Sequence, residues 1–216
     1  MEVKTYKKVR NNLYEITLNN GEKFKLYDDI ILKYELLIER KVTDKKLVSI
    51  IAENAKMEAY YKALRYVSTK MRSEIEIRKY LNKNDTPQAA KEYAIDKLKK
   101  DGYLNQEKYA QAFINDAINL GNDGLHKIRK DLELQGIDKN IVESYLNLIE
   151  DEVWRSRIEK VLLKKAKTNK VGYVLFKNKM YNELVMLGYD SSMIGQVLDS
   201  FSLDTDLVFS KEATKV

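Results

Sequence analysis

The stretch GIDKNIVESYL, residues 136–146, has a near copy 52 residues later in GYDSSMIGQVL, residues 188–198. In both stretches an aspartate follows two residues after a glycine, and aspartate is a good N-cap for a helix. The apolar residues behind each aspartate recur at positions i, i+1, i+4 and i+5, which places them on one face of a helix. The two stretches therefore predict the same turn and the same amphipathic helix, used twice.

An earlier copy of this pattern starts at Thr86, which lies 52 residues before Asp138. Asn84 and Asp85 stand here in place of the glycine turn. We expect Thr86 to cap the helix and Pro87 to occupy its first position, where the missing N–H of proline is tolerated. The matching apolar positions in the three copies are Ala89, Ile141 and Met193; Ala90, Val142 and Ile194; Tyr93, Tyr145 and Val197; and Ala94, Leu146 and Leu198.

Two more amphipathic stretches precede each of these helices. The nearer stretch includes residues 77–81 in the first copy, 128–132 in the second and roughly 173–187 in the third. The farther stretch carries apolar residues at helical spacing, which are Tyr60, Leu64 and Val67; Tyr109, Phe113 and Ala117; and Trp154, Ile158 and Val161. The repeating unit is therefore three helices. Tandem units of this kind contact mainly their neighbours, and we expect an elongated body.

The first 42 residues differ from the rest of the chain. The turn Asn19-Asn20-Gly21 lies between two short β-prone runs, and Asn-Gly in such a place predicts a β-hairpin. Asp28 and Asp29 then start a short helix that we expect to reach about Leu37. A longer helix is predicted from Thr43 to about Thr69.

Gly102, in the stretch KKDGYLNQ (residues 99–106), lies between the first and second copies. We expect a left-handed glycine to end one helix there and Asn105 to cap the next. The predicted domains are residues 1–42, the hairpin and short helix; 43–104, the first repeat with its leading helix; 105–150, the second repeat; and 151–216, the third repeat and the C-terminal tail. The predicted fold is mainly α, an elongated tandem array of three three-helix repeats preceded by a small N-terminal β-hairpin and helix region.

The chain carries a net charge of +6, which is unevenly distributed. Counting Lys and Arg against Asp and Glu gives +2 for residues 1–58, +5 for 59–105, −3 for 106–150 and +2 for 151–216. A protein that coats nucleic acid along its whole length is expected to stay basic throughout. The acidic second repeat therefore argues against a role limited to DNA binding and favours a partner with both signs of charge.

Several kinds of protein are disfavoured by what the sequence lacks. It has no cysteine for disulfides or thiolate chemistry, no apolar segment typical of a signal peptide, and no apolar run near the ~18 residues of a membrane span. We expect a cytoplasmic protein without membrane contact. The single histidine, His126, has no other ligand residues clustered beside it, and no glycine-rich phosphate-binding motif occurs. The sequence predicts neither an enzyme nor a cofactor or metal site.

Four short motifs follow one another along the chain, and the first two are residues 72–77, RSEIEI, and residues 102–110, GYLNQEKYA. They resemble the RS-x-x-E-(L/I) signature and the GYLDD…FA joint of the RecX family of recombination regulators. Residues 124–137 resemble its GP-x-x-I…L…GI segment, although Leu125 replaces the proline, and residues 187–189 resemble its third-repeat turn. Asn105-Gln106 replaces the usual acidic pair of the joint. The resemblance covers about residues 57–200.

The resemblance implies a function in homologous recombination and DNA repair. Members of the family bind RecA, the ATP-dependent recombinase that polymerises on single-stranded DNA. They block growth of its filament or promote its disassembly, and so reduce its recombinase, ATPase and SOS coprotease activities. The implied partner is the RecA filament on DNA, with direct DNA contact in some members. We expect a monomer, because no heptad seam indicates a dimer.

An alternative function is direct DNA binding, in which the protein competes with RecA for single strands. That alternative predicts tight, strongly salt-dependent DNA binding in the absence of RecA. It is disfavoured as the main mode by the acidic second repeat.

Candidate contact residues are basic side chains on, or just before, the second helix of the first two repeats. They are Arg72, Arg78, Lys79, Lys83, Lys127, Arg129 and Lys130. Lysine and arginine there would meet an acidic filament surface or DNA phosphates. A solvated charged face is the competing interpretation. For Arg72 a structural role competes as well, since Ser73 and Glu76 have the spacing of a capping box beside which Arg72 would pair with a carboxylate.

Overall fold

A computed structural model of the chain describes residues 1–169 and 171–201, so the predicted tail, residues 202–216, lies outside the described residues. The chain divides into two compact units, unit 1 (Met1–Asn105) and unit 2 (Gln106–Val216, with residues 106–169 and 171–201 described). Each unit has its own hydrophobic core. The division lies one residue from the predicted boundary between the first and second repeats, and the other two predicted boundaries fall inside the units.

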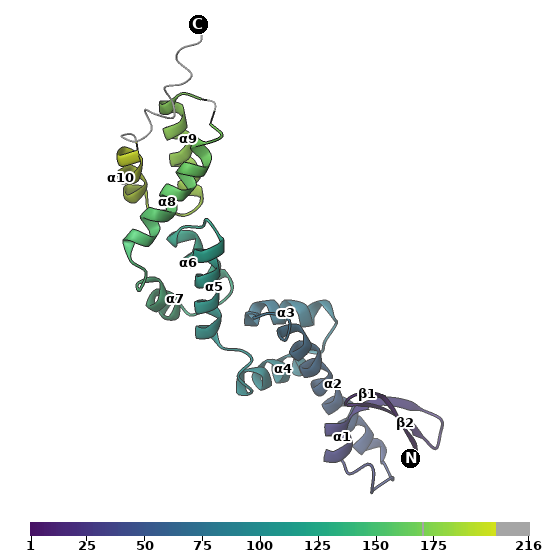
Figure 1. Cartoon of the computed structure of the whole chain (residues 1–216). Helices are drawn as coiled ribbons and strands as arrows, with labels where there is room; N and C mark the ends of the chain where they lie inside the picture. Colours follow the sequence, from purple (N-terminus) through teal and green to yellow (C-terminus); the bar gives the residue numbers. More distant parts are fainter. Residues whose placement is uncertain (170, 202–216) are drawn as a thin grey trace. The chain divides into compact units, whose positions relative to one another are not determined.

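Unit 1 begins with a three-stranded antiparallel sheet of strands β1 (Val3–Arg10), β2 (Leu13–Leu18) and β3 (Lys23–Tyr27), in that order (Figure 1). The predicted hairpin is β2 and β3. Its turn has Gly21 at φ +88° and a hydrogen bond of 2.8 Å from the Leu18 N–H to the Glu22 carbonyl. Strand β1 was not predicted, because most of its side chains are exposed and its alternation is therefore weak.

Helix α1 (Asp28–Lys33) is shorter than predicted. Glu35 adopts a left-handed conformation at φ +51°, and the Leu36 N–H returns to the Ile31 carbonyl at 3.0 Å. This turn ends the helix and buries Leu36, which is 1% exposed. The expected end of the helix at about Leu37 was wrong. The apolar Leu36 had been assigned to the helix, but it is buried as part of the turn that follows the helix.

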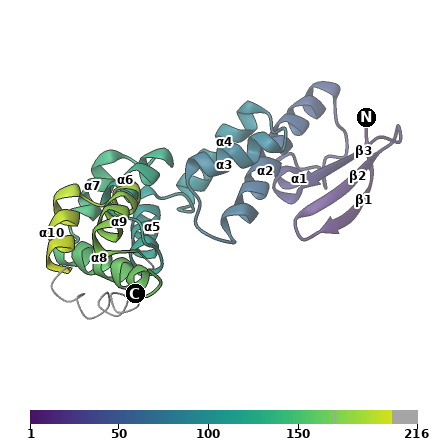
Figure 2. The same ribbon diagram turned by 90° about the horizontal axis from the view of Figure 1, so that it is seen from above.

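The first repeat consists of helices α2 (Asp44–Val67), α3 (Glu74–Lys83) and α4 (Gln88–Lys100). The predicted start of α2 is confirmed, since the Thr43 side chain accepts a hydrogen bond from the Lys46 N–H. The beginning of α2 lies beside the sheet and α1, and the remainder packs against α3 and α4 (Figure 2). Asn54 ties α2 to the sheet, because its amide bonds the Tyr27 N–H at 3.0 Å and the Lys25 carbonyl at 3.0 Å.

The predicted cap of α4 was wrong by one residue. The helix starts at Gln88 and its N-cap is Pro87, while the buried hydroxyl of Thr86 has no hydrogen-bond partner in the described part of the chain. Asp85, at φ +49°, takes the left-handed position of this turn and shifts the helix start. The apolar register is nevertheless as predicted, because Ala90 and Ala94 are both buried.

Unit 2 contains the second and third repeats. Their helices are α5 (Gln106–Leu120), α6 (Leu125–Leu134) and α7 (Lys139–Leu146), followed by α8 (Asp151–Ala166), α9 (Tyr173–Met186) and α10 (Ser191–Phe201). One core runs through both repeats and includes Leu132 and Ile158. The predicted caps at Asp138 and Asp190 are confirmed. The Asp138 carboxylate accepts a hydrogen bond from the Asn140 N–H at 2.8 Å, and the Asp190 carboxylate accepts one from the Met193 N–H at 3.0 Å.

The glycines of the repeated pattern lie at turns and have a left-handed backbone, which was predicted for Gly102. Gly136 at φ +75° and Gly188 at φ +84° are the left-handed residues between the second and third helices of their repeats. Gly102, at φ +78°, ends α4, where the Tyr103 N–H bonds the Leu98 carbonyl at 2.9 Å. Mainly helical structure in three-helix repeats behind a small β region is therefore confirmed.

Candidate partner-binding surface

The seven predicted contact residues lie on or directly before α3 and α6, the second helices of the first two repeats. They fall into two groups. Arg72, Arg78, Lys127 and Arg129 are half-buried and form ion pairs within the protein. Lys79, Lys83 and Lys130 are exposed, and they make no ion pair within residues 1–169 and 171–201. The two groups therefore have different chemistry available to a partner.

Arg78 ties the second helix of repeat 1 to the third. Its guanidinium donates to both carboxylate oxygens of Glu92, at 2.8 and 2.9 Å, and to Glu74 at 2.8 Å. These bonds raise the pKa of Arg78, and the hydrogen bond from Arg78 holds the pKa of Glu92 below its usual value. A bidentate pair of this kind fixes the geometry of both helices.

Arg129 makes the same connection in repeat 2. It bonds the two carboxylate oxygens of Glu143 at 2.6 and 3.2 Å, and the sequence separation is 14 residues, as it is for Arg78 and Glu92. The hydrogen bond from Arg129 lowers the pKa of Glu143. We call these two pairs the clasps. Their recurrence assigns both arginines a structural role within their own repeats.

Among residues 151–169 and 171–201, the third repeat forms no clasp at the matching positions. Its buried Met180 corresponds to Ile128, so Tyr181 corresponds to Arg129, and Gly195 lies 14 residues farther on. Apart from its own stretch of helix, no atom lies within 4 Å of a Cβ built on Gly195, and Tyr181 is 38% exposed. The clasp position is therefore uncharged in the third repeat, and α9 and α10 are linked instead by an ion pair between Lys177 and Asp199, one helical turn away.

Arg72 is held in a stack of aromatic rings. Its guanidinium lies 4.2 Å from the ring centroid of Tyr66, which stacks on Tyr80 at 4.3 Å. Arg72 also bonds Glu76 at 3.1 Å, and Glu76 completes the predicted capping box with the buried Ser73. The RS-x-x-E pattern is thus accounted for by the start of α3, whose side chains it locks in place.

Lys127 is the least buried of the paired group. It bonds Asp123 at 2.7 Å, one helical turn earlier, and this bond raises its pKa. Lys79 and Lys130 differ from it in having no such partner in the described residues. Each directly follows the clasp arginine of its repeat, so the clasps present equivalent free ammonium groups on two repeats.

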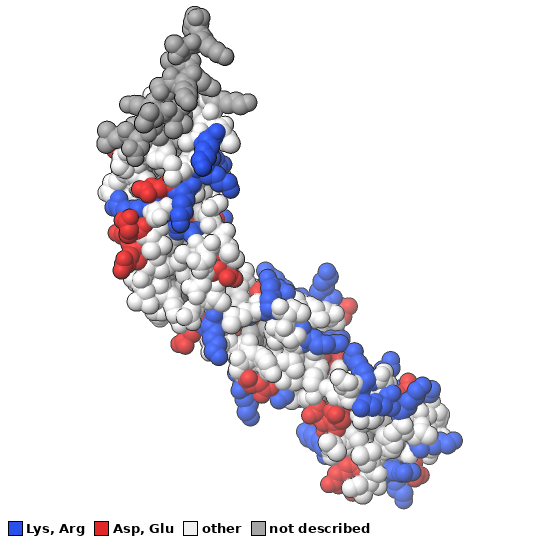
Figure 3. Space-filling model, viewed as in Figure 1, with Lys and Arg blue, Asp and Glu red and all other residues white. Residues whose placement is uncertain are grey.

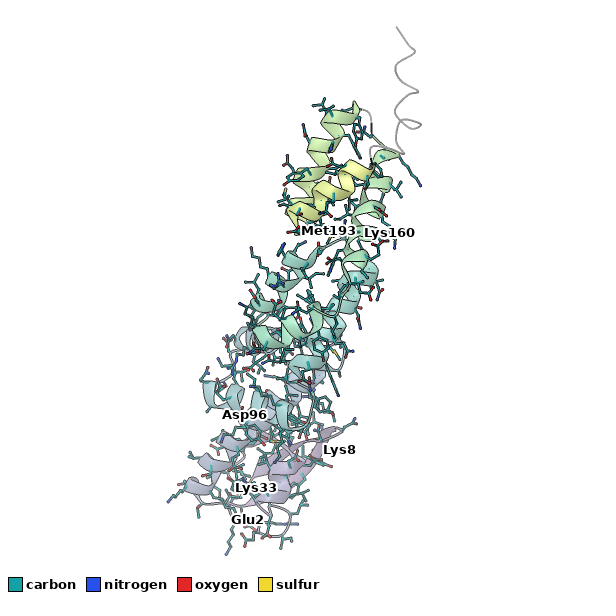
Figure 4. The ribbon with its side chains drawn as sticks, turned by 90° about the vertical axis from the view of Figure 1, so that its left-hand side faces the viewer. Glu2, Lys8, Lys33, Asp96, Lys160 and Met193 are labelled. Carbon is teal, nitrogen blue, oxygen red and sulfur yellow. The ribbon has the colours of Figure 1, made fainter. Side chains whose placement is uncertain are left out.

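The two units differ strongly in charge. Unit 1 contains 23 Lys and Arg against 16 Asp and Glu, a net charge of +7, whereas unit 2 contains 16 against 17, a net charge of −1. On the face shown in Figure 3 basic side chains gather over unit 1. Lys8, labelled in Figure 4, is one of four basic residues that β1 exposes. These strand residues were not among the predicted contacts.

Sequence reasoning also missed Arg157, a buried arginine on α8 that is 8% exposed. It bonds backbone carbonyls at the end of α5 and has no carboxylate partner in the described part of the chain. An arginine in a helix looks like a surface residue in sequence. The only available signal was its place on the helix. Arg157 follows the buried Trp154 by three residues and directly precedes the buried Ile158, so it lies on the same side of the helix as these core residues.

Two of the motif segments meet each other in unit 2. The Gly124 N–H bonds the Leu187 carbonyl at 2.7 Å, and the His126 N–H bonds the Gly188 carbonyl at 2.9 Å. A Cβ on Gly124 would lie 2.5 Å from the Gly188 carbonyl carbon, so both glycines are required for this close approach. The motifs around residues 124 and 188 are therefore a structural joint between repeats.

Two other features are missing from the described residues. Among residues 1–169 and 171–201, no three His, Cys, Asp or Glu side chains gather to hold a metal ion. No helix in the same ranges has the length and apolar character needed to cross a membrane.

Comparisons with known proteins agree with this architecture. Residues 59–98, from the middle of α2 to the end of α4, match the family model for the first three-helix domain of RecX. A crystal structure of a regulatory protein RecX is similar in fold, with a TM-score of 0.77 and 24% identity over 92% of this chain and 98% of that one. The crystal structure of RecX from Lactobacillus salivarius gives a TM-score of 0.61 over 70% of this chain and 99% of that one.

Curated relatives are similar over almost the whole length. The regulatory protein RecX of Lactobacillus gasseri is 28% identical over 95% of this chain and 76% of that protein. The regulatory protein RecX of Streptococcus agalactiae serotype V is 31% identical over 91% of this chain and 76% of its own length. With this similarity, and with three-helix repeats that match the solved structures, the chain belongs to the RecX family.

Proposed function

We propose that the protein binds the RecA filament on DNA and mainly inhibits its recombinase, ATPase and SOS coprotease activities. Membership of a family whose members are named regulatory proteins supports this proposal. The observation that carries it is the pair of free ammonium groups, Lys79 and Lys130, at equivalent positions on two repeats. Equivalent contacts on successive repeats suit a partner that is itself a repeating polymer.

The remaining predicted residues differ in whether their charged groups are paired within the protein. Lys83 joins Lys79 and Lys130 as a contact, since all three are exposed and make no ion pair in the described part of the chain. Arg78 and Arg129 act through the clasps that position the two helices. The near-neutral unit 2 favours a protein surface with both signs of charge over a continuous DNA track as the main partner.

A competition experiment tests the proposal. RecA filaments are formed on single-stranded DNA, DNA-dependent ATP hydrolysis is followed, and the protein is added together with increasing free single-stranded DNA. We expect inhibition to persist, because contact with RecA does not depend on free DNA. Loss of inhibition in proportion to the added DNA would contradict the proposal and establish competition for DNA.

A charge reversal locates the contact. The double variant Lys79→Glu, Lys130→Glu is expected to weaken inhibition about tenfold, as loss of two complementary charges does at a protein interface. The matched control is Lys160→Glu on α8, an exposed lysine that makes no ion pair with described residues. Equal inhibition by the double variant and the control would remove α3 and α6 from the contact surface.

Direct binding of single-stranded DNA is the second candidate function, and the net charge of +7 on unit 1 favours it. Its signature is binding of labelled DNA without RecA, with an affinity that falls steeply with salt. Fluorescence anisotropy between low and physiological salt measures this. The function is rejected if the protein leaves the anisotropy of the DNA unchanged at low salt.

A further inference from the structure

Arg157 occupies an unusual position at the joint between the second and third repeats. Its Nη2 atom donates to the carbonyls of Ala117 at 2.9 Å, Gly121 at 3.1 Å and Asp123 at 3.1 Å, and its Nη1 atom donates to Ile118. The last carbonyls of a helix have no partner within the helix, and they form its negative end. One side chain of α8 therefore covers the end of α5.

Burial of this cation has a cost that its bonds only partly offset. Its Nε atom is buried and has no hydrogen-bond partner, and within the described residues no carboxylate neutralises the charge. The Trp154 ring, at 5.9 Å, supplies a weak cation–π contact. A buried charge without a counter-ion stabilises little, although it specifies geometry where its hydrogen bonds are well placed.

The rest of the joint is also polar and backbone-mediated. It consists of the two hydrogen bonds from Gly124 and His126, described above, and of the Tyr189 hydroxyl, which donates to the Asn122 carbonyl at 3.0 Å. The shared apolar core includes Ile128, Leu132 and Ile158, and Tyr189 belongs to it as well. The joint therefore combines apolar packing with a polar fastening of residues 117–126 to α8 and to residues 187–189.

We propose that Arg157 is a latch, and that its release opens this polar fastening without unfolding either repeat. Local opening of a segment takes less free energy than unfolding of the whole unit does. The latch acts on the candidate surface, because α6 starts at the joint. A Cβ on Gly188 would lie 2.5 Å from the Lys127 nitrogen, so this turn abuts the first turn of the helix that carries Lys130.

Amide hydrogen exchange on the full chain tests the latch directly. In Arg157→Met, the amides of Gly124 and His126 are expected to exchange about tenfold faster than in the wild type, while those of Val142 and Ile194 change less than about twofold. The first two amides bond across the joint, and the second two bond within their own helices, to Asp138 and Asp190. Arg157→Lys keeps the charge and reaches fewer carbonyls, so an intermediate rate is expected.

Arg155→Met is the matched control, since Arg155 is on the same helix and bonds Gln196 instead of the joint. It should leave the Gly124 and His126 rates unchanged. Equal acceleration of all four amides in the Arg157 variants would overturn the proposal, because Arg157 would then contribute only to global stability. Unchanged rates at Gly124 and His126 would overturn it as well. If Arg157→Met loses its helical circular dichroism, Arg157→Lys decides between these outcomes.

A second measurement rests on the proposed function. We expect Arg157→Lys to inhibit RecA ATP hydrolysis several-fold less than the wild type does, since the start of α6 is no longer held. If the wild type does not inhibit RecA, the proposed function fails while the exchange rates still decide the latch. If the wild type inhibits and Arg157→Lys inhibits equally, the latch has no influence on the contact surface.

Discussion

Units 1 and 2 solve the same packing problem in different ways. Each contains the three-helix repeat, which leaves an apolar surface that a neighbour must cover. In unit 1 the neighbour is the sheet, and α2 has 24 residues because its beginning covers that sheet. In unit 2 the neighbour is another repeat, and the corresponding helices α5 and α8 have 15 and 16 residues. The length of the first helix thus reflects what the repeat packs against.

The comparison extends to the surface. Unit 1 is strongly basic and contains one repeat. Unit 2 is near neutral and contains two repeats, which are joined through glycines and a buried arginine. The clasp occurs in both units, on α3 with α4 and on α6 with α7, so it belongs to the repeat. The joint of Gly124 and Gly188 belongs to unit 2 alone, since it serves the pairing of repeats there.

The largest expected effect tests whether the two cores are separate. Leu132→Ala should destabilise unit 2 by about 3 kcal/mol, as truncation of a fully buried leucine does. Trp154 is the only tryptophan and lies in the third repeat, so its fluorescence in urea reports unit 2. The matched variant Leu81→Ala, in the core of unit 1, should leave the Trp154 transition in place. A shift of equal size in both variants would show one common core.

The glycine joint is the next target. Gly124→Ala should destabilise unit 2 by about 2 kcal/mol, because the new Cβ would overlap backbone atoms of the 188–189 turn. Gly195→Ala is the control in the same unit, and it should stabilise α10 by up to about 1 kcal/mol, since nothing lies near its Cβ. Both are measured by Trp154 fluorescence in urea. Equal effects of the two variants would show that the close approach at Gly124 does not stabilise unit 2.

The clasp of Arg129 and Glu143 is expected to contribute less to the stability of unit 2 than the glycine joint does. Arg129→Gln should lower the stability of unit 2 by about 1 kcal/mol, because the pair with Glu143 is only partly buried. Tyr181→Ala, at the corresponding position of the third repeat, should cost less than about 0.5 kcal/mol, since Tyr181 is 38% exposed and forms no ion pair in the described part of the chain. Urea midpoints at constant ionic strength measure the difference. A larger loss for Tyr181→Ala would show that the third repeat depends on a contact of its own.

The smallest effect is a change in pH dependence. Arg129 holds the pKa of Glu143 below the usual 4.5, so the pair stabilises the fold above that pH and the contribution is lost as pH falls through the lowered pKa. We expect the stability of unit 2 to decline more gently below pH 4.5 in Glu143→Gln than in the wild type. Glu133→Gln, at an exposed residue without an ion pair in the described part, is the control. Parallel curves for both variants would contradict the assignment.

Much of the fold was predictable because it depends on local rules. The caps Asp138 and Asp190, the left-handed Gly102 and the hairpin turn at Gly21 are each decided by a few neighbouring residues. Predictions failed where packing overruled the local pattern. Asp85 took the turn position and displaced the cap expected at Thr86, and the exposed strand β1 is defined by its pairing with β2.

The candidate site was predictable only as a set of charges. Sequence placed seven cations on two helices, because amphipathic periodicity separates outward positions from core positions. It could not divide them into clasps and free lysines. The partners Glu92 and Glu143 come from another helix, 14 residues away, and their geometry depends on how the helices cross.

The three-helix repeat, its turns and the uneven charge follow from the amino-acid sequence alone, since helix periodicity, capping and left-handed glycine are properties of short segments. Long-range packing is what makes repeats 2 and 3 share one core, brings the two motif glycines together and buries Arg157 on backbone carbonyls. Those features join residues tens of positions apart, and long-range packing, unlike periodicity, leaves no regular signal in a single sequence.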